Sequence, residues 1–275
     1  MNAFQVRMAA ATDAGARKGN EDALAHGLGP NGHYAVLADG AGGHARGREA
    51  SHRAVDAMVR VWLDPGVAFS DLNFTQMVRL AHSELVHHQD SDHPEHRMHT
   101  TLVALWIEPT ARFVLWTHVG DSRLYRVRQG RCELLTQDDS VVQQMVQAGL
   151  LTPEQSRNHP QKNHLVAALG IEGDIEPHTV VRPVELKSGD AFLLCSDGWW
   201  DGFEPAEIAA ALNRALQAED WLRDMQVQIK ARGAPKQDNF SAIAVWVGNP
   251  GEVTLIRSDD TLPRALFLRQ PGAPV

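Results

Sequence analysis

The chain has 275 residues, of which 43% are hydrophobic and 22% charged, and its formal net charge is −8. This composition is that of a globular protein with one large domain or two small ones, and the acidic excess argues against nucleic acid or an anionic membrane as a partner, because both require basic patches. No apolar run reaches the roughly 18 residues of a membrane helix, the N-terminus lacks a signal pattern, and two cysteines make no disulfide framework. We therefore expect a cytoplasmic protein.

Hydrophobic periodicity and turn residues predict strands and helices grouped in blocks. In chain order they are strands 4–9 and 33–38, helices 48–63 and 73–88, strands 101–107, 112–119 and 123–128, a helix capped by Ser140, strands 179–184 and 191–196, helices opening at Pro205 and spanning 220–232, and strands 240–247 and 252–256. This order favours α+β layers over a parallel βαβ sheet. The polar, helical segment 136–170 is predicted to be an insertion beside the core.

Aspartates follow apolar strands repeatedly, and three of them stand beside a glycine: Asp39-Gly40, Gly120-Asp121 and Asp197-Gly198. Taken singly, each is more often a turn aspartate than a ligand, because Asp-Gly is a common turn dipeptide. The set as a whole is harder to explain as turn residues, because further carboxylates also flank strands. The complete group is Glu21, Asp22, Asp39, Asp121, Asp197, Asp201 and Asp238.

Carboxylates brought together in one place repel each other and are costly to desolvate unless cations neutralise them. Oxygen ligands without paired Cys or His select Mg²⁺ or Mn²⁺ over Zn²⁺, and the backbone carbonyl of Gly40 can complete the shell. Arg17, four residues before Glu21, is suited to bidentate phosphate binding. The alternatives are a solvated Arg17 and a merely flexible Gly-rich loop at 40–44.

The ordered set of motifs resembles the type 2C metal-dependent Ser/Thr protein phosphatases in their bacterial form, from about residue 17 to residue 247. The matching segments are Arg17-Lys18-Gly19-Asn20-Glu21-Asp22, Asp39-Gly40-Ala41-Gly42-Gly43-His44, Thr100-Thr101-Leu102, Gly120-Asp121-Ser122-Arg123, Leu135-Thr136-Gln137-Asp138-Asp139-Ser140, Ala167-Ala168-Leu169-Gly170, Ser196-Asp197-Gly198 with Asp201, and Gln237-Asp238-Asn239. The resemblance implies a four-layer sandwich of two antiparallel β-sheets flanked by α-helices. It also implies a catalytic domain over 1–250, with a mobile flap at about 136–170, and a C-terminal strand or tail at 251–275.

The resemblance further implies a role for each site residue. Asp39 would bridge two Mn²⁺ or Mg²⁺ ions, with Asp197 and Asp238 on the first and Glu21 and the Gly40 carbonyl on the second. Asp121 and Asp201 would bind a third ion more weakly, and Asp22 and Asn239 would hold the ligands in place without contacting an ion. Arg17 would hold the phosphate.

The activity implied is hydrolysis of phosphoserine and phosphothreonine by a metal-activated bridging water. Relatives often carry a histidine where this chain has Ala41, so His44 is the candidate proton donor to the leaving group. The implied partners are phosphorylated Ser/Thr proteins, in particular a cognate Ser/Thr kinase and its substrates, and we expect a monomer. A histidine is also common at the position of Asp139, so the flap departs from the family pattern there.

Two other functions stay open, namely a pseudophosphatase that only binds phosphoproteins and a different metal-dependent phosphoester hydrolase. A thiol phosphatase is excluded because Cys-x₅-Arg is missing: Asp138 follows Cys132 by six residues, and Asp201 follows Cys195 by six. No P-loop motif is present. The histidine-rich segment 87–99 is predicted to be a solvated loop, with binding of a softer metal as its alternative.

Overall fold

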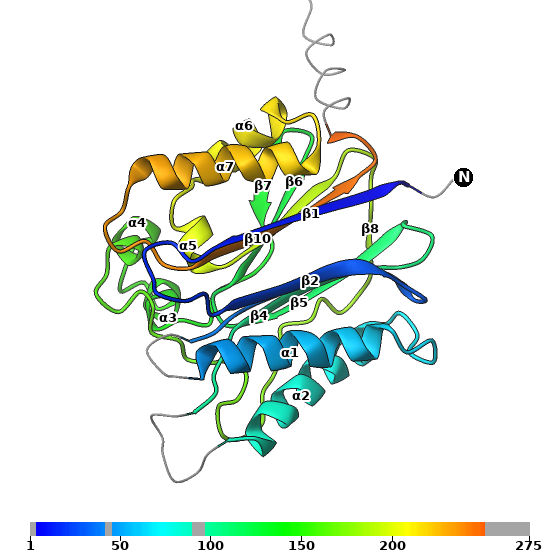
Figure 1. Cartoon of the computed structure of the whole chain (residues 1–275), viewed down its shortest axis with the longest axis horizontal. Helices are drawn as coiled ribbons and strands as arrows, with labels where there is room; N and C mark the ends of the chain where they lie inside the picture. The colour runs from blue at the N-terminus through cyan, green and yellow to red at the C-terminus, as the bar shows by residue number, and fades with distance from the viewer. Residues whose placement is uncertain (1–3, 42–45, 90–96, 251–275) are drawn as a thin grey trace, which may run out of the picture.

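The computed structural model describes residues 4–41, 46–89 and 97–250 and consists of two β-sheets packed face to face between two helical layers (Figure 1). Each sheet is antiparallel and has five strands, in the orders β1-β10-β9-β6-β7 and β2-β3-β4-β5-β8. This is the predicted four-layer α+β sandwich. None of the helices in the described ranges is long and apolar enough to cross a membrane.

The first sheet contains β1 (Val6–Asp13), β6 (Arg123–Arg128), β7 (Arg131–Leu134), β9 (Ala191–Cys195) and β10 (Phe240–Val247). The second sheet contains β2 (Asp22–Gly29), β3 (Gly32–Asp39), β4 (Leu102–Ile107), β5 (Phe113–Val119) and β8 (Val184–Glu185). The helices are α1 (Gly47–Trp62), α2 (Asp71–His87), α3 (Val141–Gln147), α4 (Pro153–Arg157), α5 (Asp197–Trp200), α6 (Pro205–Arg214) and α7 (Ala218–Arg232).

The sheets bury a shared apolar layer between them, to which Leu37, Leu105, Leu194 and Ile243 contribute fully buried side chains. Side chains alternate between the two faces of a strand, so the neighbouring residues point outward and need a second cover. The helices supply that cover, which is why β4 and β10 are buried along their whole length.

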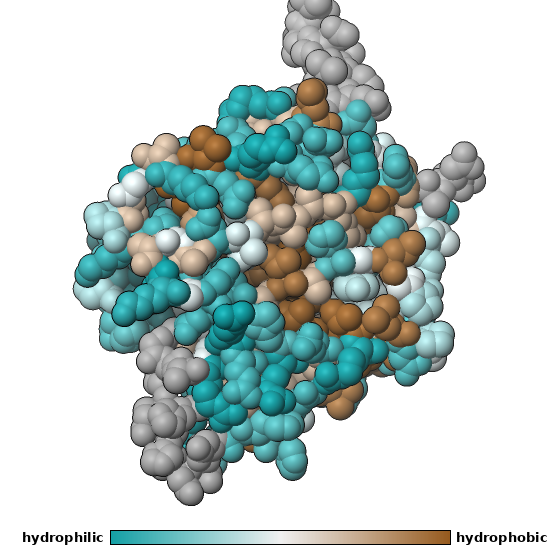
Figure 2. All heavy atoms as spheres, viewed as in Figure 1, coloured by the Kyte–Doolittle hydropathy of each residue, from teal (hydrophilic) through white to brown (hydrophobic). Residues whose placement is uncertain are grey.

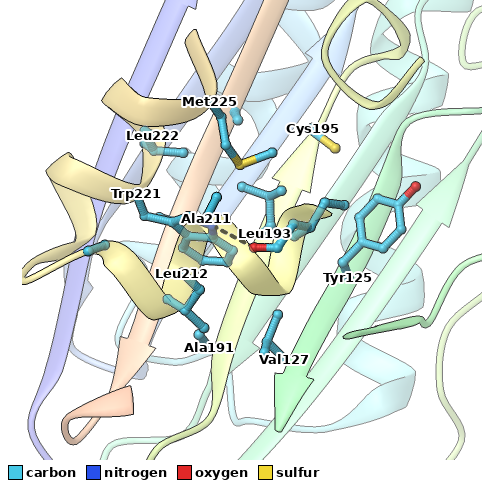
Figure 3. Close-up of a cluster of buried hydrophobic side chains, with 14 of the residues drawn as sticks. Tyr125, Val127, Ala191, Leu193, Cys195, Ala211, Leu212, Trp221, Leu222 and Met225 are labelled. Atoms are coloured by element: carbon cyan, nitrogen blue, oxygen red, sulfur yellow. Dashed lines mark hydrogen bonds between the residues drawn. The ribbon is translucent and has the colours of Figure 1, made fainter. Parts of the chain in front are cut away.

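On the first sheet the outer cover is formed by α6 and α7, whose apolar faces lie over β9 and β6 (Figure 3). Trp221 packs here beside Leu193 and Met225, and its indole N–H donates to the Ile208 carbonyl at 3.2 Å. On the second sheet α1 and α2 do the same, with Trp62 stacked on Tyr34 at a ring separation of 5.1 Å. Figure 2 shows hydrophilic side chains covering much of the helical layers and a band of apolar ones between them.

The pairing register brings distant aspartates to one end of the sandwich. β1 runs antiparallel to β10, so the turn after Asp13 lies beside the residues that precede Phe240. Asp22 opens β2 directly opposite Asp39, the last residue of β3. The strand ends that carry the candidate ligands therefore converge in space.

Several expected elements differ from those observed. The predicted strand 179–184 forms a strand only at its last residue, where Val184–Glu185 pairs with β5, although the Val180 N–H also donates to the Trp116 carbonyl of β5 at 3.0 Å. The edge strands β2 and β7 and the short helices α4 and α5 were not predicted, and β1 extends beyond residue 9 to Asp13. Ser140 does cap α3, accepting from the Gln143 backbone N–H. The expected strand 252–256 lies outside the described residues.

Candidate active site

A cavity of about 360 Å³ opens where the strand ends converge, and four aspartates line it: Asp39, Asp121, Asp197 and Asp238. Asp39 is the last residue of β3, Asp121 and Asp197 each lie two residues beyond the ends of β5 and β9, and Asp238 lies two residues before β10. The predicted residues Arg17, Gly40 and Asn239 line the same cavity. Seven of the predicted site residues therefore lie around one cavity, while the roles assigned to them stay predictions.

Asp39 is fixed by the start of β4. Its backbone N–H donates to the Thr101 hydroxyl at 3.0 Å, and its carbonyl accepts from the Thr101 N–H at 2.9 Å and the Thr100 hydroxyl at 2.8 Å. The Thr101 hydroxyl also bonds Ser122, next to Asp121, at 2.7 Å. One pair of threonines therefore sets the relative positions of two of the aspartates.

Asp197 is the first residue of α5, and the glycine that follows it is required by close packing. A Cβ on Gly198 would come 2.1 Å from the Asn239 carbonyl oxygen, so only glycine lets β10 approach. Directly before Asp197, the Ser196 hydroxyl donates to Asp22 Oδ2 at 3.0 Å. Asp22 is 6% exposed, and its other carboxylate oxygen is buried without a hydrogen-bond partner.

Asn239 ties the N-terminal loop to the site. Its side-chain oxygen accepts from the Glu21 N–H at 2.8 Å, and its amide group donates to the carbonyls of Ala14 and Gly19, both at 2.9 Å. The loop held in this way carries Arg17, whose Nη2 donates to Asp238 Oδ2 at 2.6 Å. The Arg17 side chain is 54% exposed, so it stands at the rim of the cavity with donors still available.

The electrostatics of the cavity are those of crowded like charges. Burial, followed by repulsion from neighbouring aspartates, raises the pKa of Asp39 and Asp121 well above the usual range. The same causes raise the pKa of Asp197 to about 7, and burial raises that of Asp22 to about 6. A divalent cation would remove the repulsion, and the all-oxygen donor set suits Mg²⁺ or Mn²⁺. The residues present therefore fit a site for hard divalent cations.

A second layer of contacts holds Asp121 and the start of the 136–170 segment. The Trp200 indole N–H donates to the Asp121 carbonyl at 3.0 Å, and the Arg123 guanidinium lies 3.4 Å from the centre of the Trp200 ring. Arg123 also forms a two-bond ion pair with Asp138, at 3.0 and 2.8 Å. These contacts join residues far apart in the chain, and nothing in the sequence pattern pointed to them.

Four predicted site residues are not among those lining the cavity, and one of them is Asp22, which accepts the buried hydrogen bond from Ser196. Asp201 is exposed and pairs with Lys162 at 2.6 Å, beside a neighbouring cavity that Asp197 and Asp238 also line. Glu21 lies next to the start of α1, where a Cβ on Gly47 would stand 3.2 Å from its Oε2. His44 falls outside the described residues.

The cavity also has lining residues to which sequence reasoning assigned no role. Thr101 belongs to a motif that was recognised without a function, whereas Asn163 and Leu165 come from the 136–170 segment. Because loop residues carry no periodic pattern, their sequence gave no signal that they face the carboxylates. Their position places the 136–170 segment against the opening of the cavity.

Comparison with known proteins agrees with this arrangement. Residues 15–237 match the family model described as Protein phosphatase 2C. The serine/threonine protein phosphatase PstP of Mycobacterium tuberculosis is 33% identical over 245 residues, which is 88% of this chain and 45% of that protein. Protein phosphatase PhpP of Streptococcus pneumoniae is 34% identical over 206 residues, covering 72% of this chain and 80% of its own length.

Among solved structures, the catalytic domain of PstP in complex with two manganese ions superposes with a TM-score of 0.75 at 29% identity, covering 89% of this chain and 99% of that one. The chain spans less than half the length of the full-length M. tuberculosis relative. Fold, site and family model together show that the chain belongs to the protein phosphatase 2C family.

Proposed function

We propose that the chain is a metal-dependent protein-serine/threonine phosphatase that hydrolyses phosphoserine and phosphothreonine in proteins. The observation that carries the proposal is the cavity in which four aspartates from separate segments meet, with Arg17 at its rim. Membership of the family, and the name serine/threonine protein phosphatase borne by its relatives, support the same conclusion.

In this proposal Asp39 would serve both of two Mn²⁺ or Mg²⁺ ions, Asp197 and Asp238 would hold one of them, and Glu21 with the Gly40 carbonyl would hold the other. Asp121 and Asp201 would serve a third ion. Bound divalent cations would supply an acidified water nucleophile and charge neutralisation for the phosphoryl oxygens. Asp22 and Asn239 would support the ligands without binding an ion. Asp22 accepts a hydrogen bond from the Ser196 hydroxyl, and Asn239 accepts one from the Glu21 N–H.

Arg17 would bind the phosphate through the donors that face solvent. Its ion pair with Asp238 fixes the guanidinium beside the cavity and raises the pKa of Arg17, chiefly through the hydrogen bond itself. A guanidinium oriented in advance loses less side-chain freedom when it binds two phosphate oxygens. Arg17 therefore contributes orientation as well as charge.

The catalytic domain is proposed to cover residues 1–250, with 136–170 acting as the flap that shapes substrate access. Asn163 and Leu165 support this assignment, because both line the cavity. The proposed partners are phosphorylated Ser/Thr proteins, among them a cognate kinase and its substrates, and the protein is proposed to act as a monomer. His44 stays the predicted donor of a proton to the leaving oxygen.

The test is hydrolysis of phosphoserine and phosphothreonine peptides by tag-free protein, with Mn²⁺ or Mg²⁺ and then with chelator. The proposal expects phosphate release that disappears with chelator and is lost in Asp39→Asn. Binding of the peptides without any release would instead identify a pseudophosphatase. Preferential hydrolysis of a phosphodiester would identify a different phosphoester hydrolase.

A further inference from the structure

A second group of potential ligands lies at the stem of the 136–170 segment, outside the carboxylate cavity. It consists of His118 in β5, Asp139 at the start of the segment, and His178 in the loop before β8. One ligand atom from each residue lies within 4.8 Å of the other two. No role in the proposed hydrolysis falls to these three side chains.

The contacts among them are close and directional. His178 Nε2 lies 2.8 Å from Asp139 Oδ1, and the imidazole rings of His118 and His178 are stacked with centroids 4.8 Å apart. His118 is 4% exposed, and its Nε2 lies 2.8 Å from the Gln137 carbonyl oxygen. Nε2 also lies 3.3 Å from the Gln137 N–H. In the tautomer that donates the shorter bond to the carbonyl, Nδ1 keeps a lone pair, and that buried atom has no hydrogen-bond partner among the described residues.

We propose that His118, Asp139 and His178 form a binding site for a transition-metal ion, Zn²⁺ in the first instance. Two imidazoles and a carboxylate favour Zn²⁺ over Mg²⁺, because nitrogen ligands suit the softer ion. Three protein ligands leave a fourth tetrahedral position for water. This donor set is chemically distinct from the all-oxygen cavity, so the two sites select different ions.

The geometry requires a small rearrangement, in which the more widely spaced ligand atoms approach each other and the 2.8 Å separation of His178 Nε2 and Asp139 Oδ1 widens. Ligand atoms about 2.1 Å from a tetrahedral ion lie roughly 3.4 Å from one another, whereas the group spans up to 4.8 Å. The backbone of His178 is held to β5 by its N–H bond to the His118 carbonyl at 3.0 Å, so the adjustment falls to rotation of the His178 side chain, which is 53% exposed. The other two ligands are already oriented by hydrogen bonds to neighbouring groups, as metal ligands usually are. Asp139 Oδ2 accepts from the Gly120 N–H at 2.9 Å, and His118 Nε2 is hydrogen-bonded to the Gln137 carbonyl.

Occupation of the site would fasten the stem of the flap. The Asp139 N–H donates to the Gly120 carbonyl at 3.0 Å, and its carbonyl accepts from the Val166 N–H at 2.8 Å, so both arms of the stem meet at this residue. An ion held by Asp139, His118 and His178 would join these arms to β5 and to the loop that carries His178. Because Gly120 precedes the candidate ligand Asp121, the ion would also steady one edge of the carboxylate cavity.

The binding test is titration of tag-free, full-length protein with Zn²⁺ in saturating Mg²⁺, followed by calorimetry, and with Co²⁺, followed by its visible absorption. We expect one Zn²⁺ per chain and a tetrahedral Co²⁺ spectrum. His178→Ala and Asp139→Asn should each weaken Zn²⁺ binding by at least about tenfold, because losing even a residue that only hydrogen-bonds to a metal ligand lowers metal affinity by about that factor. His87→Ala, an exposed histidine of the histidine-rich segment, is the matched control and should bind Zn²⁺ as the wild type does.

A second readout follows amide hydrogen exchange, which does not depend on catalysis. Zn²⁺ should slow exchange around residues 137–141 and 164–167 in the wild type and in His87→Ala, but not in His178→Ala. Unchanged Zn²⁺ affinity in His178→Ala and Asp139→Asn would overturn the proposal, as would loss of binding in His87→Ala alone. Absence of Zn²⁺ binding to the wild type would leave His178 and Asp139 as an ion pair only and would likewise refute the site.

Discussion

The two ends of strand β9 place aspartates in opposite electrostatic surroundings. Asp190, just before the strand, has a fully buried side chain, and its carboxylate accepts two bonds from Arg128, each at 2.6 Å, and one from the Lys187 N–H at 2.8 Å. Asp197, two residues beyond the other end, faces Asp22 and Asp238 instead, and its pKa is raised to about 7 by burial and by these neighbours.

This difference separates a structural aspartate from a ligand. Both aspartates are adjacent to a glycine and both flank the same apolar strand, so their local sequences are alike. At the Asp190 end an arginine neutralises the buried charge, and the pair fastens the turn into β9. At the Asp197 end, no arginine in the described part of the chain forms an ion pair with Asp197, and Arg17 is paired with Asp238 at the rim. The excess negative charge is what a divalent cation can neutralise.

The largest effect is expected from removing the central charge of the cluster. Asp39→Asn should lower kcat by at least about 10³-fold, the upper range for one electrostatic catalytic group, while circular dichroism and the fold stay intact. Steady-state kinetics on a phosphothreonine peptide measure the change. A variant that keeps more than a tenth of wild-type turnover would remove Asp39 from its central role.

At the other end of β9, Asp190→Asn should reduce stability and leave kcat nearly unchanged. Breaking a buried ion pair costs about 3–5 kcal/mol, and because the Arg128 side chain is 22% exposed we expect about 3 kcal/mol. Urea unfolding measures this difference. The control Asp56→Asn, on an exposed position of α1, should stay within about 0.5 kcal/mol of the wild type. Equal free energies of unfolding for Asp190→Asn and Asp56→Asn would contradict the structural role of the Asp190–Arg128 ion pair.

A smaller effect is expected at the rim. Arg17→Ala should raise KM by about tenfold, equivalent to one charge-assisted hydrogen bond, with a lesser change in kcat. Arg17→Lys keeps the charge without the two-donor fork and should recover only part of the loss. If KM and kcat of Arg17→Ala both equal those of the wild type, Arg17 does not contact the phosphate.

A further effect is expected on how the stability of the metal-free protein depends on pH. The pKa values of Asp197 and Asp22, about 7 and about 6, are raised above the unfolded value of about 3.9. Between these pH values the folded state therefore binds more protons than the unfolded state. The free energy of unfolding should therefore fall as pH rises from about 4 to about 7. Thermal unfolding in chelator and in Mg²⁺ measures this, and Mg²⁺ should suppress the fall. A rise in stability over this range in chelator would contradict the raised pKa values.

Much of the layered fold could be predicted from hydrophobic patterns. Strands β6 and β10 were predicted with their observed bounds, because dense apolar and β-branched residues mark them. β2 escaped prediction, since a strand rich in glycine and alanine acquires its form from pairing with β3. The run 179–184 has the composition of a strand, but most of it precedes the two residues that pair with β5 and is joined to the backbone of β5 by the bond from the Val180 N–H to the Trp116 carbonyl.

The candidate site, like the fold, could be predicted only in part from the sequence. Strand-end aspartates were visible because each follows an apolar run, and the order of motifs linked them. The stacking of Arg123 on Trp200 and the approach of Asn163 to the cavity depend on contacts between segments tens of residues apart. Such contacts leave no periodic trace in a single sequence. The triad of His118, Asp139 and His178 could not be inferred for the same reason.

The most direct test of the central claim is to count bound Mn²⁺ by calorimetry in the wild type, Asp39→Asn and Asp190→Asn, at equal protein concentration and after complete chelation. Tight binding of two ions by the wild type and by Asp190→Asn, with loss of at least one in Asp39→Asn, is the predicted result. Retention of both ions by Asp39→Asn would contradict it, because the crowded aspartates would then not be what holds the metal.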